Sequence, residues 1–258
     1  MNQVIDLQIW QMLAAYIFVL IVMLIVKLKG IPREKELLIS SVRMTIQLIL
    51  TGYLLIYLFD TSSPLYTILV LIGMEVFSVQ NIIKRTKRKL SAELIRIIAF
   101  SMAAGTISCL LYFLLVVVRI SPWYHARYFI PIAGMLIGNS MTGISIGVNR
   151  LSEGMELQKN IIEGALMLGA TPKMAAKQIV DHAFDSAILP TINSMVGMGI
   201  VFLPGMMTGQ ILSGTSPVTA IEYQIAIMLG ILGSVALSVI LFVQLGYQTF
   251  FNDQSQLR

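Results

Sequence analysis

Two side chains of this sequence carry charge within long apolar stretches, and they are its first candidates for chemistry. Arg43 and Glu75 both lie where an ionised group is costly and usually faces a partner or a water-filled cavity. At 1.5 Å of rise per residue, both lie roughly 9–12 Å from the same edge of their stretches. We therefore expect an intramembrane ion pair that orients two helices. Alternatively, Glu75 faces a pathway as a carboxylate for a hard cation.

A second set of polar and sulfur-bearing side chains lies farther along the chain. Oxygen ligands suit hard cations, and thioethers suit soft ions such as Cu(I). Methionine is also a common packing residue, and asparagine can hydrogen-bond between helices. We expect a translocation pathway along the two stretches that carry this set, with contributions from Asn139, Met141, Thr142, Asn193, Met195, Pro204, Thr208 and Gln210.

The sequence predicts no catalytic centre. Its single cysteine, Cys109, excludes a multi-cysteine metal site. The two histidines, His125 and His182, are expected on opposite sides of a membrane, and no nucleophile–base arrangement is visible. The phosphate-binding pattern G-x-x-x-x-G-K-[ST] does not occur in the 258 residues. We therefore expect no enzyme and no cofactor bound by this chain, so that any ATP and Mg²⁺ would be bound by a partner subunit.

The composition decides which elements must position these side chains. Of the 258 residues, 57% are hydrophobic and 12% are charged, and the mean hydropathy is +0.83. Soluble domains carry about 25% charged residues. The chain is therefore predicted to be an all-α polytopic membrane protein, with 1–258 as a single transmembrane domain. About seven spans are expected, at 9–27, 37–59, 64–83, 96–118, 128–148, 186–212 and 219–247. Pro204-Gly205 is expected to kink or break the sixth of them.

Lysine and arginine residues predict the orientation of these spans. Nearly all of them lie in the first, third and fifth connections, whereas the opposite side carries only Arg119 and Arg127. Cytoplasmic connections are enriched in such residues. We therefore expect a protein of the cell membrane with its N-terminus outside and its C-terminus in the cytoplasm. The net charge of +5 then reflects orientation and not nucleic-acid binding.

The long connection 149–185 is predicted to be a cytoplasmic helical hairpin between spans five and six. Gly169 can end a helix in the left-handed conformation, Thr171 can cap the next helix, and Pro172 suits its first position. The first helix has one apolar face formed by Leu157, Ile161, Ala165 and Leu168. Two interpretations remain open, namely an amphipathic hairpin that lies on the membrane and a docking surface for another protein.

The hairpin sequence resembles a known coupling element. Glu163-Gly164-Ala165, followed after three residues by Gly169, is similar to the start of the EAA loop in membrane subunits of ABC transporters. In that family, a short cytoplasmic helix fits a cleft in the ATP-binding subunit. The family pattern has alanine where Gly164 stands. The resemblance implies that the ATPase is contacted by Glu163, Gly164, Ala165, Gly169, Ala170, Thr171 and Pro172.

A closer resemblance covers nearly the whole chain. It rests on Gly138-Asn139-Ser140-Met141-Thr142-Gly143-Ile144-Ser145, on Leu168-Gly169-Ala170-Thr171-Pro172, and on the run from Leu203-Pro204-Gly205 to Gln210-Ile211-Leu212. These motifs resemble the FetB family of ABC permeases, whose bacterial members are implicated in iron export and whose plant relatives are implicated in aluminium tolerance. The resemblance implies a homodimeric permease in the lipid bilayer that exports metal ions, iron first among them, and is powered by a separate ATP-binding subunit.

Two other functions are compatible with the sequence. The chain could be a self-sufficient secondary transporter or channel that uses Glu75 as its titratable group. It could also be a membrane adaptor whose hairpin recruits a soluble protein without transport.

Overall fold

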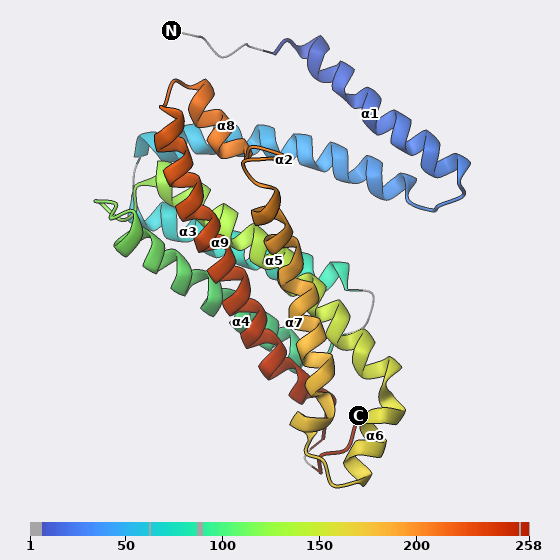
Figure 1. Ribbon diagram of the computed structural model, residues 1–258. Helices are drawn as coiled ribbons and strands as arrows, with labels where there is room; N and C mark the ends of the chain where they lie inside the picture. Colours follow the sequence, from blue (N-terminus) through green and yellow to red (C-terminus); the bar gives the residue numbers. More distant parts are fainter. Residues whose placement is uncertain (1–6, 62, 87–89, 253, 258) are drawn as a thin grey trace. The chain divides into compact units, whose positions relative to one another are not determined.

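The structure is a computed structural model that describes residues 7–61, 63–86, 90–252 and 254–257. Apart from turns and two isolated bridges, these residues form helices (Figure 1), which confirms the predicted all-α fold. The chain divides into two compact units, which are residues 1–62 with 212–214 and residues 63–211 with 215–258. Each unit is described by itself, and the single domain expected over 1–258 stays a prediction.

The first unit is a pair of helices, α1 (Ile9–Leu28) and α2 (Glu34–Thr61). Gly30, with φ of 65°, lies in the turn between them. The hydroxyl groups of Tyr16 and Thr45 hydrogen-bond across the pair. No residue of α1 is buried, although the helix is almost entirely apolar. Such a surface is expected of helices whose neighbours are lipid chains.

The second unit contains the remaining helices. In chain order they are α3 (Pro64–Arg85), α4 (Ala92–Tyr112), the π-helix η1 (Phe113–Val117), α5 (Ala126–Leu157), α6 (Lys159–Met167), α7 (Pro172–Gly197), α8 (Gly205–Leu212), α9 (Pro217–Gly246) and the 3₁₀ helix η2 (Tyr247–Phe250).

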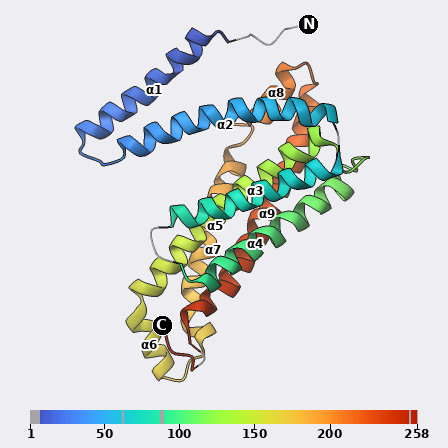
Figure 2. The ribbon, with the colours of Figure 1, turned by 180° about the vertical axis from the view of Figure 1, so that it is seen from behind.

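Helix α9 is the centre of packing in the second unit, where it contacts α4, α5 and α7. The views in Figures 1 and 2 show these helices alongside one another. Two glycines permit the close approach. A Cβ atom on Gly105 of α4 would lie 2.2 Å from Ser238 Oγ, and one on Gly143 of α5 would lie 2.9 Å from a methyl group of Val235. The absence of side chains at these two positions therefore sets the distances of α4 and α5 from α9.

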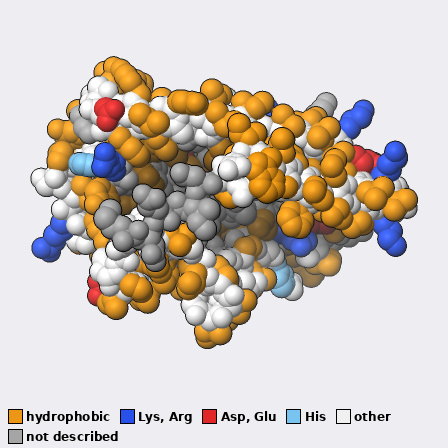
Figure 3. Space-filling view, turned by 90° about the horizontal axis from the view of Figure 1, so that it is seen from above, with side chains coloured by type: hydrophobic (Ala, Val, Ile, Leu, Met, Phe, Trp, Pro, Cys, Tyr) orange, Lys and Arg blue, Asp and Glu red, His pale blue; other side chains and the backbone are white. Residues whose placement is uncertain are grey.

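Six helices are long and apolar enough to span a membrane, and they confirm six of the expected spans. Among the described residues these helices are Ile9–Leu28, Glu34–Thr61, Pro64–Arg85, Ala92–Val117, Ala126–Leu157 and Pro217–Phe250. Figure 3 shows hydrophobic side chains over most of the face in view, with few charged ones. The chain is therefore a multi-pass membrane protein.

The expected span at 186–212 differs from the structure, because it is not one helix. Helix α7 begins at Pro172, continues through Pro190 and ends at Gly197. Gly199 then has φ of 82°, and its N–H donates to the Phe202 carbonyl at 2.9 Å. Helix α8 starts only at Gly205. The predicted interruption at Pro204-Gly205 is present, but a tight turn that begins at Gly197 widens it.

Candidate functional site

The corner between α6 and α7 has a defined backbone geometry. Gly169 has φ of 89°, its N–H donates to the Leu166 carbonyl at 3.0 Å, and the N–H of Ala170 donates to the Ala165 carbonyl at 3.0 Å. This pair of bonds is the Schellman ending of a helix. Thr171 then caps α7, because its hydroxyl oxygen accepts from the Met174 N–H at 3.3 Å. The corner predicted from the sequence is therefore confirmed.

Large apolar side chains protrude from this corner and from the ends of the adjoining helices. Met167 and Leu168 are 87% and 91% exposed. We name the exposed group the tip patch, and it comprises Leu157, Ile161, Met167, Leu168 and Met174. Exposed apolar groups of this kind mark surfaces that contact another protein or a membrane. The apolar face predicted for the first hairpin helix is thus largely uncovered in the structure.

The tip patch stands on two long helices and not on a separate loop. Helix α5 continues past the expected membrane edge at 148 to Leu157, and α7 starts 14 residues before the expected edge at 186. The two helices touch where a Cβ atom on Gly154 would lie 2.5 Å from Ile179 Cγ2. Ile162 of α6 is 1% exposed and belongs to the core. The base of the corner is therefore fixed to the bundle (Figure 1), with the C-terminal end of the chain nearby.

The residues expected to contact an ATPase lie together at this corner. Glu163 on α6 is half-buried and pairs with Lys159 at 3.7 Å. A Cβ atom on Gly164 would meet nothing within 4 Å. Together with Glu163, the remaining members follow one another through the corner, and they are Gly164, Ala165, Gly169, Ala170, Thr171 and Pro172. Their role in contacting another subunit stays a prediction.

Three of the expected pathway residues lie exposed on α5 and α7. Asn139 and Thr142 are on α5, and Asn193 is on α7. Asn139 Nδ2 donates to the Met135 carbonyl at 2.8 Å, and the Thr142 hydroxyl donates to the Gly138 carbonyl at 3.1 Å. Helices α5 and α7 contact each other. Polar side chains therefore lie on the outer surface of two neighbouring helices, within the stretches that the sequence predicts to span the membrane.

The other expected pathway residues are partly buried. Asn81 Nδ2 of α3 donates to Met141 Sδ at 3.3 Å, and Met195 packs against the core. On the far side of the turn, the Thr208 hydroxyl donates to the Pro204 carbonyl at 3.1 Å, and Gln210 follows on α8. Met141 and Met195 thus pack against the core, and the translocation pathway expected along these eight residues stays a prediction.

The intramembrane ion pair predicted between Arg43 and Glu75 stays a prediction, because Arg43 belongs to the first unit and Glu75 to the second. Within its own unit, Glu75 hydrogen-bonds through Oε1 to the hydroxyl of Thr106 on α4. A second buried contact joins Ser140 of α5 to Ser234 of α9 at 2.8 Å. Sequence reasoning missed Thr106. The one sequence signal for this contact was that Thr106 is expected at about the same membrane depth as Glu75, on the following helix.

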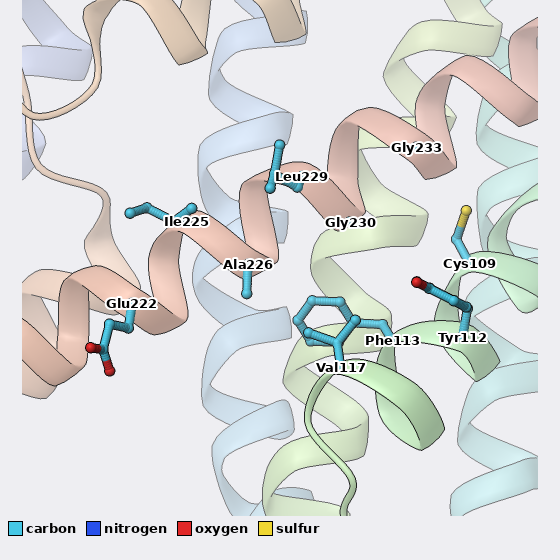
Figure 4. A pocket seen from close by; sticks show the side chains of 10 residues that line it. All are labelled: Cys109, Tyr112, Phe113, Val117, Glu222, Ile225, Ala226, Leu229, Gly230 and Gly233. Atoms are coloured by element: carbon cyan, nitrogen blue, oxygen red, sulfur yellow. The ribbon is translucent and has the colours of Figure 1, made fainter.

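A groove of about 630 Å³ lies between the α4–η1 segment and α9. Figure 4 shows Glu222 at one end, Cys109 at the other and the ring of Phe113 between them. The remaining lining is mainly apolar. Among the described residues, no three His, Cys, Asp or Glu side chains lie close enough together to hold a metal ion. The groove therefore offers apolar contact and not a ligand set for a metal.

The model of the uncharacterised protein family UPF0014 matches residues 9–251. The chain belongs to the UPF0014 family. No solved structure matches the chain significantly.

Several UPF0014 relatives align over almost their full length. The UPF0014 membrane protein YjkA of Bacillus subtilis is 36% identical over 94% of this chain and 95% of its own. The probable iron export permease protein FetB of Escherichia coli is 34% identical over 94% of this chain and 92% of its own. Protein ALUMINUM SENSITIVE 3 of Arabidopsis thaliana is 33% identical over 95% and 88% respectively. The family resemblance read from the sequence motifs is therefore confirmed.

Proposed function

We propose that this chain is the membrane-spanning permease subunit of an ABC transporter that exports metal ions, with iron as the first candidate. Two copies of the chain pair with each other and with two copies of a separate subunit, which binds ATP and Mg²⁺. The name of the E. coli relative, a probable iron export permease, supports both the direction and the cargo.

The observation that carries this proposal is the exposed tip patch on a fixed base. From residue 149 to Leu157 and from Pro172 to residue 185, the helices extend roughly 14 and 21 Å beyond the expected membrane edge at 1.5 Å per residue. Lys159 on α6 and Lys173 and Lys177 on α7 support a cytoplasmic location. Since the patch stands well away from the bilayer, a protein partner can cover it more readily than lipid.

The polar outer surfaces of α5 and α7 support a pathway between two copies of the chain. Asn139, Thr142 and Asn193 are exposed, and polar groups that face lipid are unfavourable. A second copy placed against α5 and α7 would cover them and leave polar side chains along the interface. Helix α5 runs unbroken from this surface to the tip patch, so movement of the tip would reach Asn139 directly.

The proposal is tested with purified chain in liposomes, with and without the separate ATP-binding subunit, by measuring flux of Fe²⁺. We expect flux only when the subunit and ATP are both present. Leu168→Glu places a charge in the tip patch and should remove most of this flux. The matched control is Leu28→Glu, since Leu28 is also highly exposed, at 76%, but ends α1 in the first unit. Flux by the chain alone would contradict the proposal and favour a secondary transporter.

A further inference from the structure

Glu75 is buried within the second unit and has unusual surroundings for an acidic side chain. It is 9% exposed and lies on the face of α3 that also buries Thr67 and Ser78. Helix α3 packs against α4 and α5. Residues 97–108 of α4 and 129–149 of α5 include no charged or titratable side chain, and neither do residues 224–246 of α9 behind them. Within the second unit, these stretches of the neighbouring helices therefore supply no positive charge that would balance an ionised Glu75.

The hydrogen bonds around Thr106 indicate which group supplies the proton. The Thr106 hydroxyl hydrogen-bonds with Glu75 Oε1, and its oxygen also lies 2.8 Å from the Met102 carbonyl oxygen. A hydroxyl group has one proton to donate. If Glu75 is ionised, that one proton must serve two acceptors. If Glu75 is a neutral acid, it donates to Thr106, Thr106 donates to Met102, and each bond has its own proton.

The second carboxyl oxygen gives independent support. Glu75 Oε2 is buried and has no hydrogen-bond partner among the described residues. An ionised carboxylate spreads its negative charge over both oxygens, and an unpaired charged oxygen is strongly unfavourable in an apolar interior. The carbonyl oxygen of a neutral acid is a weaker acceptor, so its burial without a partner is tolerated more easily.

A proton fits this site better than a metal ion does. Hard divalent cations take about six to eight oxygen ligands, whereas Glu75 hydrogen-bonds to one hydroxyl group and belongs to no group of three His, Cys, Asp or Glu side chains among the described residues. A proton requires only one lone pair. We propose that Glu75 is a proton-binding site within the membrane, and that it is a neutral acid donating to Thr106 while α3 is packed against α4. Separation of these helices would admit water to the carboxyl group and release the proton.

This inference goes beyond the proposed function, and its test needs neither ATP nor cargo. Infrared difference spectra are recorded at neutral pH on the full chain in lipid nanodiscs, comparing the wild type with Glu75→Gln. We expect the carbonyl stretching band of one protonated carboxylic acid in the wild type only. Thr106→Val should shift that band to higher frequency, because the acid loses its acceptor. The matched control Thr142→Val, on the exposed face of α5, should leave it unchanged.

The alternative ion pair gives a different set of spectra. If Glu75 is ionised and paired with Arg43, the wild type shows the two carboxylate bands instead, and Arg43→Gln alters them. That result overturns the proposal. We expect Arg43→Gln to leave the acid band in place. Should Glu75→Gln fail to fold, the shift of the acid band in Thr106→Val decides the question, and the absence of any shift contradicts the proposal.

Discussion

At the scale of single residues, the α6–α7 corner depends on a few local choices of side chain. Gly169 tolerates the positive φ that other residues avoid, and Thr171 supplies an oxygen to an otherwise unsatisfied N–H at the start of α7. Pro172 follows at the first helical turn, where no N–H is needed. These residues act through contacts within the corner itself, so the sequence alone was sufficient to predict it.

The cap of α7 can be tested directly. Thr171→Ala removes the hydroxyl oxygen that accepts from Met174 and should lower the free energy of unfolding by about 1 kcal/mol. Thr171→Ser keeps an oxygen at the same position and should preserve most of the stability. Equilibrium unfolding in mixed detergent micelles measures both values. Equal stability of the alanine and serine variants would show that the cap contributes nothing.

The partner of Glu75 could not be predicted in the same way. The sequence indicates that Glu75 and Arg43 lie at similar depth, but depth does not determine which faces of two helices meet. Thr106 is 31 positions away, and its contact with Glu75 depends on the rotation of α3 against α4. Similarly, Asn139 is exposed and its neighbour Ser140 is buried because of the way α5 packs against other helices. The sequence pattern does not distinguish these two adjacent polar residues.

At the scale of elements, the contact of α5 with α7 supports the tip. The sequence predicted the hairpin but treated residues 149–185 as a connection separate from spans five and six, with membrane edges at 148 and 186. In the structure, both helices continue through this region. The sixth span, at 186–212, was expected to break at Pro204-Gly205, and in the structure α7 already ends at Gly197. Proline is a conspicuous signal, yet α7 tolerates Pro190 and ends at the Gly197-Met198-Gly199 turn.

The close contact of α5 with α7 gives a prediction for Gly154. Gly154→Ala places a Cβ atom 2.5 Å from Ile179 Cγ2, so the helices must move apart and the free energy of unfolding should fall by about 1–3 kcal/mol. In the double variant with Ile179→Ala, part of that loss should be recovered, which thermal unfolding in detergent can measure. Gly164→Ala is the control, since its Cβ atom meets nothing within 4 Å. If Gly154→Ala and Gly164→Ala are equally stable, the helices are not in tight contact.

At the scale of the whole molecule, the tip patch can contact an ATP-binding subunit only from the cytoplasmic side of the membrane, opposite the side predicted for the N-terminus. Among the described residues, six helices are long and apolar enough to span a membrane, and the turn after Gly197 interrupts the expected span at 186–212. Lysine and arginine residues favour the cytoplasm for the tip side. The orientation is therefore a prediction from charge, which the helix positions do not determine by themselves.

Cysteine labelling tests this orientation. In a background where Cys109, the one native cysteine, is replaced by alanine, Met174→Cys and Leu7→Cys are introduced singly at exposed positions. A membrane-impermeant thiol reagent added to intact cells should label position 7 and leave position 174 unlabelled until the cells are opened. Labelling of position 174 from outside would place the tip on the wrong side for an ATP-dependent partner.

The central claim is that the tip patch contacts a subunit that hydrolyses ATP. Its most direct test is a photo-reactive amino acid at position 168, irradiated in cells that express both proteins, with position 28 as the matched exposed control. We predict a covalent product between the chain and the ATP-binding subunit from position 168 and none from position 28. Products with lipid alone from position 168, in cells where the ATP-binding subunit is present, would contradict the claim.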